Sequence, residues 1–555
     1  MKKISISNEV GPQSRNLRTL CSEVLVLVIT ALVYSFAFPG FLTDKGLCFF
    51  AFFSLVGMFA VIKNTTWKLI PFYGFLFGFI FYLCFNYWLK SFHPLAILIA
   101  PLIKGVELIF AFLALKAALT LFKKWAFLVE AVIWVAYAYL SQSWFAGYPY
   151  GTLGYAIYKY RILIQIADIT GVWGVTFMLV LPQIFLGNWL SDYYNNRQFG
   201  LWQTIKKEKI AVISYAVFVL ITIVYGLFSI SYWNNKEPDL NWRVATVQHN
   251  ADSWEGGYST YKMNFTNLSR MSLEALREDP DIILWSETAF VPSVNWHTKH
   301  PNEKDPKTTQ LVDDFVNFGK GLPVPLVTGN PEGVIDDSSL SAYDEDDNWN
   351  RKNYNTVIFF DEGEIKQTYR KQHLVPFTEH FPYEKQLPLL YKLLKANDFH
   401  WWEKGNESVV FTTAEGVKFS TPICFEDVFG DVCANFVKNG ADVILNMTND
   451  SWSGVVSAEM QHAAMATFRS IENRKTTIRS TNSGISCMIS PIGKIIDPMT
   501  PFKAYWHIYD VPVFTEKSET LYTRYNDWFG KAMGIIGLLL LGFGLVLKLL
   551  KKRDK

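Results

Sequence analysis

Long apolar runs constrain this chain of 555 residues more than any other feature of its sequence. Most of them have close to the length that crosses about 30 Å of hydrocarbon at about 1.5 Å per helical residue, although the second run is short. The runs are Val24–Phe38, Leu47–Ile62, Leu69–Leu89, Leu95–Phe122, Trp125–Leu140, Ile164–Leu190, Ile210–Ile230 and Met533–Leu550. The pattern predicts a membrane α-helical bundle of about eight spans.

The overall composition agrees with a membrane protein. Hydrophobic residues make up 50% of the chain and charged residues only 18%, which is too apolar for an ordinary soluble protein of this size. The first apolar run alone resembles a signal peptide, with Ser35 and Ala37 as small residues at its end, but the runs that follow at once favour an uncleaved anchor. The net charge of +2 gives no reason to expect a nucleic-acid partner. The six cysteines show no metal-binding spacing, so no zinc site is expected.

Basic residues gather in alternate loops between the runs, which predicts an orientation. The richer set of loops belongs on the cytoplasmic side by the positive-inside rule, so both termini are expected in the cytoplasm. The members of that set are Lys63, Lys68, Lys123, Lys124, Arg197, Lys206, Lys207 and Lys209, with Lys548, Lys551, Lys552, Arg553 and Lys555 in the tail. We therefore predict a bundle of seven spans at 1–230, an outer domain at 231–532, and a last transmembrane helix with a basic cytoplasmic tail at 533–555.

The segment 231–532 alternates β-rich runs with helical stretches, which is typical of a layered α/β domain with buried strands. The predicted strands are Trp242–Gln248, Asp281–Trp285, Val324–Gly329, Thr356–Phe360, Lys418–Ile423, Val443–Met447, Thr476–Ser480 and Ser486–Ser490. The predicted helices are Tyr261–Glu278, Thr308–Phe318, Asp427–Lys438 and Ala458–Asn473. About 280 residues are ample for one hydrophobic core.

Three reactive side chains stand at strand ends in this segment: Glu287, Lys371 and Cys424. A cysteine at a strand end is usually a small buried hydrophobe, and a glutamate there is usually a solvated terminus. Together, however, a carboxylate supplies a base and an ammonium supplies a positive charge, and a thiol needs both to become a strong nucleophile. We also expect Phe425 to Asp427 to open a helix, which aims backbone N–H groups at the thiol and can hold an oxyanion.

Five motifs, three of which contain these residues, resemble the carbon–nitrogen hydrolase (nitrilase) superfamily over Val244–Ile508. The motifs are Leu284–Ala289, Tyr369–Glu379, Ile423–Glu426, Asn449–Trp452 and Arg479–Ile485. With the flanking spans, the whole chain is similar to the apolipoprotein N-acyltransferases, the membrane-embedded branch of that superfamily. The resemblance implies a nitrilase-like αββα sandwich on the periplasmic face, with Glu287 as general base, Lys371 as oxyanion stabiliser and Cys424 as nucleophile.

Further site residues follow from the motifs and from composition. The resemblance implies that Glu379 and Glu426 are pocket carboxylates, with Trp452 near the acyl site and Asn449 beside it. Trp401 and Trp402 lie in an aromatic stretch, 380–402, that is either a packed arm or a mobile lid at the membrane interface. Two observations concern the spans and their loops. Lys104 and Glu107 lie one helical turn apart and either form a structural pair or face a lipid-accessible cavity, and the outside loop 145–151 is expected to abut the pocket.

The resemblance implies a bacterial inner-membrane enzyme. It would transfer an acyl chain from a phospholipid, typically phosphatidylethanolamine, through a cysteine thioester to the α-amino group of the S-diacylglyceryl cysteine of an apolipoprotein. This ping-pong scheme needs no metal and no organic cofactor. Two alternatives remain open: a membrane-tethered amidohydrolase of the nitrilase type with a small substrate, and a non-enzymatic membrane protein such as a transporter or scaffold.

Overall fold

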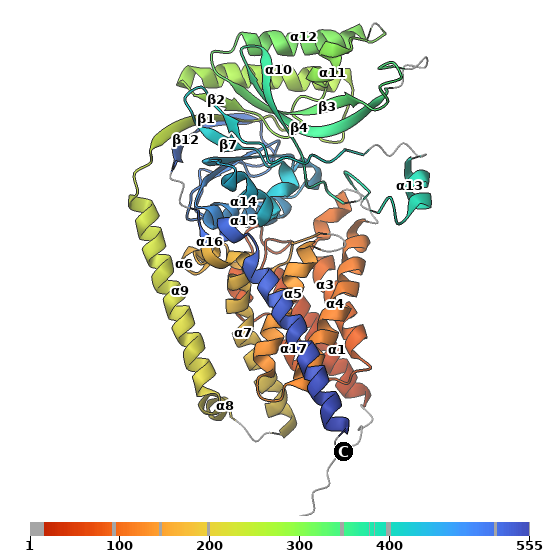
Figure 1. The fold of residues 1–555 in the computed structure, drawn as a ribbon, viewed down its shortest axis with the longest axis vertical. Coiled ribbons are helices and arrows are strands. Elements are labelled where there is room, and N and C mark those ends of the chain that lie inside the picture. The colour runs from red at the N-terminus through yellow and green to blue at the C-terminus, as the bar shows by residue number, and fades with distance from the viewer. Residues whose placement is uncertain are drawn as a thin grey trace, which may run out of the picture.

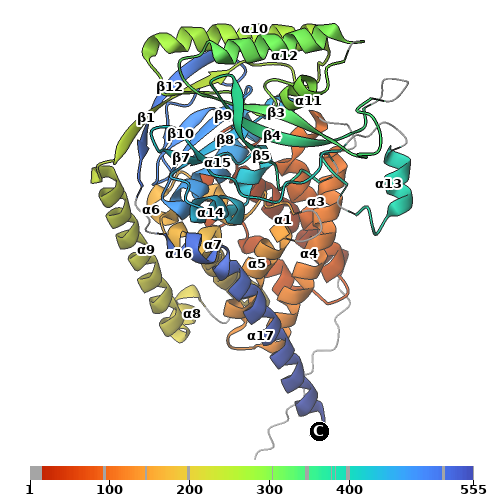
Figure 2. The ribbon, with the colours of Figure 1, turned by 45° about the horizontal axis from the view of Figure 1, so that its top comes forward.

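The computed structural model describes residues 16–91, 96–143, 147–196, 200–302, 304–343, 349–376, 378–381, 383–395, 401–515 and 519–553. An α-helical bundle forms its lower part in Figure 1, and an α/β unit sits on one end of that bundle. The chain passes from the bundle to the α/β unit along one long helix and returns along another, so that both regions belong to one continuous molecule (Figures 1 and 2).

All eight predicted apolar runs are helical, at least in part. Within the described residues, six helices are long and apolar enough to cross a membrane, and two shorter apolar segments accompany them. The long helices are α1 (Leu17–Phe36), α4 (Ala96–Leu121), α5 (Ala126–Ser143), α7 (Ala167–Asn196), α9 (Lys209–Asn235) and α17 (Trp528–Arg553). The shorter ones are α2 (Val56–Asn64) and α3 (Ile70–Phe85). The estimate of about eight spans is therefore approximate, since two of the eight helices are short.

The second run is shorter because its helix is interrupted. A 3-10 turn, η1 (Cys48–Phe52), precedes α2, and the nine residues of α2 rise only about 14 Å. Backbone groups freed by the break need partners inside a bilayer. Gln183 of α7 supplies them, because its Nε2 donates to the carbonyl of Ala51 at 2.9 Å and its Oε1 accepts from the N–H of Leu55 at 2.7 Å.

The α/β unit contains two six-stranded sheets that pack face to face. The first has the order β12-β1-β2-β3-β4-β5 and the second β11-β10-β9-β8-β7-β6. The first sheet's strands are β1 (Leu240–Gln248), β2 (Ile282–Leu284), β3 (Leu326–Ile335), β4 (Arg351–Asp361), β5 (Glu364–Arg370) and β12 (Tyr505–Val513). The second sheet's strands are β6 (Phe411–Thr412), β7 (Lys418–Ser420), β8 (Val443–Thr448), β9 (Thr476–Thr481), β10 (Cys487–Ile489) and β11 (Ile495–Ile496).

Helices cover the outer face of each sheet. Helices α10 (Tyr258–Ala275) and α12 (Pro306–Lys320) lie over the first sheet, away from the bundle, while α14 (Gly430–Lys438) and α15 (Val456–Asn473) lie between the second sheet and the bundle (Figures 1 and 2). The predicted αββα sandwich is therefore confirmed. Every predicted strand and helix is present in part. The strand expected before Lys371, without predicted bounds, is β5. The sequence did not predict β6, β11 and β12, nor the short helices α11 (Val294–Lys299), α13 (Pro388–Lys395) and α16 (Leu521–Tyr525).

Alternation along the strands explains why both faces of each sheet are buried. In β1, Val244 belongs to the core between the sheets, whereas Ala245 and Val247 belong to the core beneath α10 and α12. Aromatic rings tie the two sheets together: the rings of Trp242 and Phe419 lie 5.5 Å apart. Strands β1, β2 and β3 are parallel, as are β7, β8 and β9, so in each sheet the carboxyl ends of three strands meet at one edge.

A buried ion pair fastens the sandwich to the bundle. Arg474, which follows α15, lies 2.7 Å from Asp168 of α7 and also donates to Gln165 at 2.6 Å and to Ser229 of α9 at 3.1 Å. All four side chains are buried. Because breaking such a pair leaves an uncompensated charge, this junction resists separation of the two regions.

Candidate active site

The three side chains singled out in the sequence follow three different strands and meet at one edge of the sandwich. Glu287 follows β2, Lys371 follows β5 and Cys424 follows β7. The Nζ of Lys371 lies 3.2 Å from Oε1 of Glu287, and both side chains are buried. The thiol of Cys424 is partly exposed and lies close enough to both charged groups for each to shift its pKa. The predicted meeting of carboxylate and ammonium is thus present, and both groups act on the pKa of the thiol.

Glu287 is held by three donors that fix its orientation. Besides Lys371, Asn355 of β4 donates from Nδ2 to Oε1 at 2.8 Å, and the backbone N–H of Asn449 donates to Oε2 at 2.9 Å. Gly329 of β3 permits this packing, because a Cβ there would lie 2.7 Å from the Cα of Glu287. A carboxylate bound on both oxygens has few orientations left, so it presents the same face to the thiol throughout.

Glu379 supplies a second carboxylate to the same lysine. Its Oε1 lies 2.8 Å from Nζ of Lys371 and 3.3 Å from Nδ2 of Asn355, and its Oε2 accepts from the N–H of Val375 at 2.7 Å. Burial alone would lower the pKa of Lys371, but the carboxylates of Glu287 and Glu379 raise that pKa well above its ordinary value. Lys371 is therefore a permanent cation, as a stabiliser of developing negative charge must be.

The backbone at Cys424 adopts an unusual conformation. Its φ is +47°, in the left-handed region that costs a residue with a side chain about 1–3 kcal/mol. The expected α-helix directly after Cys424 is wrong: a 3-10 turn, η5 (Cys424–Val428), follows, and α14 begins only at Gly430. Phe429 is extended and separates the two, so the turn, rather than a helix end, presents the thiol.

The thiol is protonated at neutral pH. Burial raises the pKa of Cys424 well above its ordinary value, and the carboxylate of Glu287 raises it further, while Lys371 opposes the shift. A thiol in this state is a weak nucleophile until a base takes its proton.

Glu426 plays a different part from the one expected. Its two oxygens are occupied by donors, so it does not line a pocket as a free carboxylate. The donors are the backbone N–H groups of Gln372 at 2.6 Å, His373 at 3.0 Å and Ile423 at 2.7 Å, with the hydroxyl of Tyr369 at 2.8 Å. Glu426 therefore ties the turn that carries Cys424 to the end of β5, where Lys371 stands.

Aromatic side chains from the bundle lie against the residues around the thiol. The ring of Phe425 stacks on that of Tyr150 with centroids 6.4 Å apart. The ring centroids of Trp452 and Trp88 lie 5.3 Å apart, and Trp88 belongs to the 3-10 turn η2 (Tyr87–Ser91) after α3. The expected contact between loop 145–151 and the site is thus present at Tyr150, while residues 145 and 146 lie outside the described residues. The bundle forms one wall beside the nucleophile.

Two residues expected to contact the substrate, Asn449 and Trp401, have contacts with protein groups. The side-chain oxygen of Asn449 accepts hydrogen bonds from Ser253 at 2.9 Å, Ser451 at 2.7 Å and Asn482 at 3.1 Å. Its contact with Glu287 is made by its backbone N–H. Trp401 stacks on Tyr391 of α13, with centroids 5.2 Å apart, in the stretch proposed as a lid. The N–H of Trp402 donates to the carbonyl of Glu379 at 2.9 Å, which anchors that stretch to the site.

Residues 382 and 396–400 of this stretch lie outside the described residues. Leu389 of α13 is 84% exposed. An apolar side chain so exposed on a helix beside a membrane bundle fits an interfacial position, although whether the stretch moves stays a prediction.

A buried charge network, made of Asp427, Asp450, His462, Arg479 and Glu459, lies behind the thiol. His462 bridges Asp427 at 2.6 Å and Asp450 at 3.0 Å, and Arg479 contacts both aspartates. Burial would lower the pKa of His462, but the two aspartates raise it to about 9. Burial raises the pKa of Glu459 well above its ordinary value, so this side chain is neutral. Two anions, Asp427 and Asp450, therefore face two cations, His462 and Arg479. Because Asp427 lies in the turn of Cys424 and Asp450 follows Asn449, the network links the nucleophile to the support of Glu287.

Sequence reasoning missed Asn355 and this charge network. Asn355 adjoins the predicted strand Thr356–Phe360, and a polar residue at the end of an apolar strand is a weak signal. It lies opposite Lys371 because β4 and β5 are antiparallel, and the N–H of Lys371 donates to the carbonyl of Asn355 at 2.9 Å.

Comparison with known proteins finds similarity along both regions. The family described as carbon–nitrogen hydrolase matches residues 243–511, and the family described as apolipoprotein N-acyltransferase N-terminal domain matches residues 30–185. The chain is 35% identical to apolipoprotein N-acyltransferase 1 of Treponema denticola, over 96% of this chain and 98% of that protein. It is 32% identical to apolipoprotein N-acyltransferase 1 of Treponema pallidum, over 93% of this chain and 94% of that protein.

Proposed function

The chain belongs to the apolipoprotein N-acyltransferase family and is an acyltransferase, and from this premise we propose that Cys424 carries the acyl group between two lipid substrates. The observation that supports the proposal most is the contact of Lys371 with Glu287 at 3.2 Å beside the strained backbone of Cys424. A fixed base, a permanent cation and a thiol on a strained turn are the parts that acyl transfer through a thioester requires.

The first half-reaction forms the thioester. Glu287 takes the proton of the Cys424 thiol, and the sulfur attacks the ester carbonyl of a phospholipid. Lys371 and the backbone N–H of Phe425 stabilise the oxyanion, and one such donor is typically worth about 3–4 kcal/mol. The carbon–oxygen bond to glycerol breaks, Glu287 returns the proton to the leaving oxygen, and a lysophospholipid departs.

The second half-reaction forms the amide. The free α-amino group of an S-diacylglyceryl cysteine attacks the thioester carbonyl, and Glu287 accepts a proton from that amine. The carbon–sulfur bond breaks, the sulfur takes the proton back, and the N-acylated lipoprotein leaves. We propose phosphatidylethanolamine as the donor and the diacylated apolipoprotein as the acceptor, with no metal or cofactor.

The membrane position supports transfer over hydrolysis. Residues of the bundle, Tyr150 and Trp88, lie against Phe425 and Trp452, so a lipid approaching the thiol remains beside apolar walls. Limited access of water protects a thioester until the amine arrives. We propose the bacterial inner membrane as the location, with both termini cytoplasmic, 1–230 as the bundle, 231–532 as the periplasmic catalytic domain and 533–555 as the last helix and tail.

The test uses the purified full-length protein, phosphatidylethanolamine labelled in its acyl chain, and a diacylated lipopeptide. We expect label on the peptide amine and, without peptide, an acyl-enzyme visible by intact mass spectrometry. Cys424→Ala should give neither signal, while Cys21→Ser is the matched control because Cys21 is exposed on α1. Full transfer by Cys424→Ala, or hydrolysis of small soluble amides without lipid transfer, contradicts the proposal and favours the amidohydrolase alternative.

A further inference from the structure

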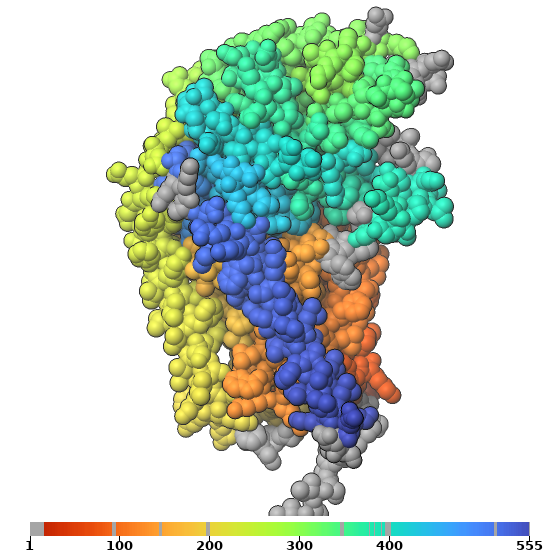
Figure 3. Space-filling view, viewed as in Figure 1, coloured from red at the N-terminus to blue at the C-terminus, as the bar shows by residue number. Residues whose placement is uncertain are grey.

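A groove with apolar walls lies in the bundle between α4, α5 and α17. Its volume is about 300 Å³. The walls include Phe110 and Ala114 of α4, Ile133 and Leu140 of α5, and Leu541 of α17. Figure 3 views the molecule from the side where α17, in dark blue, crosses the orange helices of the bundle. Because α17 is largely unburied within the protein, this side of the groove faces the lipid.

One end of the groove is polar. Lys104 of α4 donates to Glu107 Oε2 at 2.9 Å and to Ser141 Oγ of α5 at 2.6 Å, and the Ser141 hydroxyl donates to the same Oε2 at 3.0 Å. Glu107 lines the groove and is only 7% exposed. Its other oxygen, Oε1, accepts no hydrogen bond from any described residue. A buried carboxylate oxygen without a donor costs free energy, so this end favours a ligand that brings one.

The polar end lies on the side of the catalytic sandwich. Gln142, next to Ser141, donates to Asp527 at 2.9 Å, and Asp527 directly precedes α17. From Glu107 the wall of α4 runs away from the sandwich to Ala114, about 10 Å at 1.5 Å per residue. A lipid whose polar part lies near the sandwich and whose chain points to the membrane centre therefore matches the groove.

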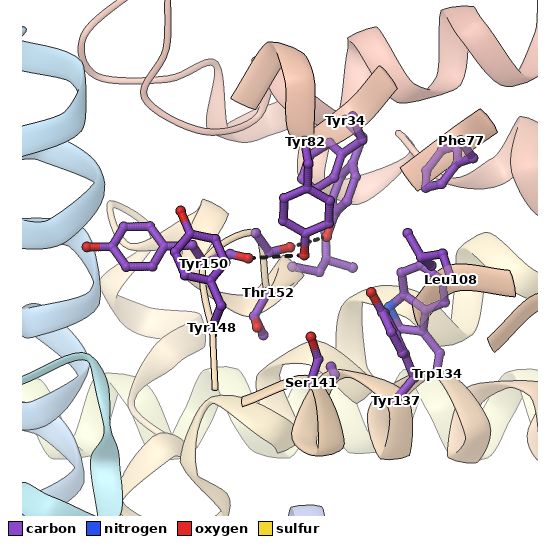
Figure 4. A pocket seen from close by; sticks show the side chains of 14 residues that line it. Tyr34, Phe77, Tyr82, Leu108, Trp134, Tyr137, Ser141, Tyr148, Tyr150 and Thr152 are labelled. Carbon is purple, nitrogen blue, oxygen red and sulfur yellow. Dashed lines mark hydrogen bonds between the residues drawn. The ribbon is translucent and has the colours of Figure 1, made fainter. Parts of the chain in front are cut away.

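A smaller cavity adjoins the groove on the side of the active site. Its volume is about 20 Å³, and it shares the wall residues Tyr137 and Ser141 with the groove. Figure 4 shows its aromatic lining, in which the hydroxyl of Tyr82 donates to the carbonyl of Tyr150 at 3.2 Å. The ring of Tyr150 in turn stacks on Phe425, next to Cys424. A continuous set of wall residues thus connects the groove with the nucleophile.

We propose that this groove binds a lysophospholipid, with its single acyl chain between α4, α5 and α17 and its free glycerol hydroxyl donating to Glu107 Oε1. The inference rests on the proposed function, because the first half-reaction releases such a molecule close by. The glycerol of an intact phospholipid has both hydroxyls esterified, so it can accept but not donate a hydrogen bond to Glu107, and a second acyl chain would also need space. A fatty acid brings a carboxylate toward Glu107, and like charges repel.

A lysophospholipid released by the first half-reaction thereby has an apolar site in the bundle. The groove holds its chain there while the amine acceptor approaches Cys424.

The experiment measures binding of palmitoyl lysophosphatidylethanolamine to the full-length protein by native mass spectrometry. Gly534→Leu fills the groove, and a Cβ at Gly534 meets no atom within 4 Å, so the fold tolerates it. Gly542→Leu on the same helix is the matched control, since a Cβ there is equally free and Gly542 is not a wall residue. We expect Gly534→Leu to weaken binding about tenfold or more and Gly542→Leu to leave it unchanged.

Glu107→Gln tests the polar end, and should weaken lysophospholipid binding about fivefold because a hydrogen bond to a charged acceptor is lost. Equal binding by both glycine variants overturns the proposal. The proposal is also overturned if Gly534→Leu loses binding of intact phosphatidylethanolamine but keeps binding of the lysophospholipid. These measurements need no turnover, so failure of acyl transfer in the lipopeptide assay contradicts the proposed function alone.

Discussion

Two buried glutamates, one in the sandwich and one in the bundle, each pair with a lysine but are satisfied differently. Glu287 receives Lys371 and Asn355 on one oxygen and the N–H of Asn449 on the other. Glu107 receives Lys104 and Ser141 on one oxygen and no described donor on the other. The same residue pair is thus fully hydrogen-bonded in one region and only partly hydrogen-bonded in the other.

The backbone explains the difference. At the strand ends of the sandwich, N–H groups leave the ladder and are free to bind carboxylates. In a transmembrane helix, the N–H groups are consumed by the helix itself, so a buried carboxylate depends on side chains or on ligands. The carboxylate of Glu287 is therefore completed by the fold, whereas that of Glu107 is completed only in part.

Removing the base should have the largest effect. Glu287→Gln keeps the shape of the side chain but cannot take the thiol proton, and we expect the kcat of acyl transfer to fall about a thousandfold. The measurement is labelled acyl transfer to the lipopeptide. The matched variant in the bundle is Glu130→Gln. In the wild type, Oε2 of Glu130 accepts a hydrogen bond from Asn188 at 2.6 Å, and we expect the substitution to change kcat less than about twofold. Equal losses in the two variants would remove the distinction between the regions.

Removing the cation should come next. Lys371→Met leaves Glu287 and Glu379 without their shared positive charge and removes one oxyanion donor, so we expect kcat to fall about a few hundredfold. Because the pKa of Lys371 is raised, the wild-type rate should show no loss from lysine deprotonation up to about pH 10. A single-turnover measurement of thioester formation checks both points. A wild-type decline near the ordinary lysine range would contradict the assignment.

The charge network predicts a pH-dependent stability. The folded state raises the pKa of His462 to about 9 from an ordinary value near 6.5, so its stabilisation is fully present below pH 6.5 and is lost as the pH rises through 9. His462→Gln should therefore lower the free energy of unfolding by up to about 3 kcal/mol at pH 6, with the difference vanishing above pH 9. Thermal unfolding in detergent across this range measures it, with His507→Gln of β12 as control. A pH-independent difference would mean that protonation plays no part.

The smallest effect is expected at Asn355. Asn355→Ala leaves Lys371 and Asn449 to hold Glu287, so the base loses orientation but not charge. We expect kcat to fall about tenfold with little change in KM, since one hydrogen bond to a charged group is removed. Asn353→Ala on the same strand is the control. A loss as large as that of Glu287→Gln would make Asn355 part of the reaction itself.

Some features could be predicted because they are local. Glu287, Lys371 and Cys424 each follow a strand-like stretch, and their types fit one chemistry. The hydrogen bonds by which Glu426 ties the turn of Cys424 to the end of β5 could not be predicted. They depend on backbone N–H groups more than 50 residues away in the chain, such as that of Gln372. Asn355 depends likewise on the pairing of β4 with β5.

The sequence by itself determined which segments form apolar helices and which side chains we propose for the chemistry, because hydrophobicity and reactivity belong to short segments. The tertiary structure alone decided that Glu107, which Lys104 contacts, lines a groove, that Tyr150 lies against Phe425, and that one carboxylate is fully bound while another is not. Those outcomes depend on the register between strands and on the packing between helices. Both are set by the whole chain at once, so no single segment encodes them.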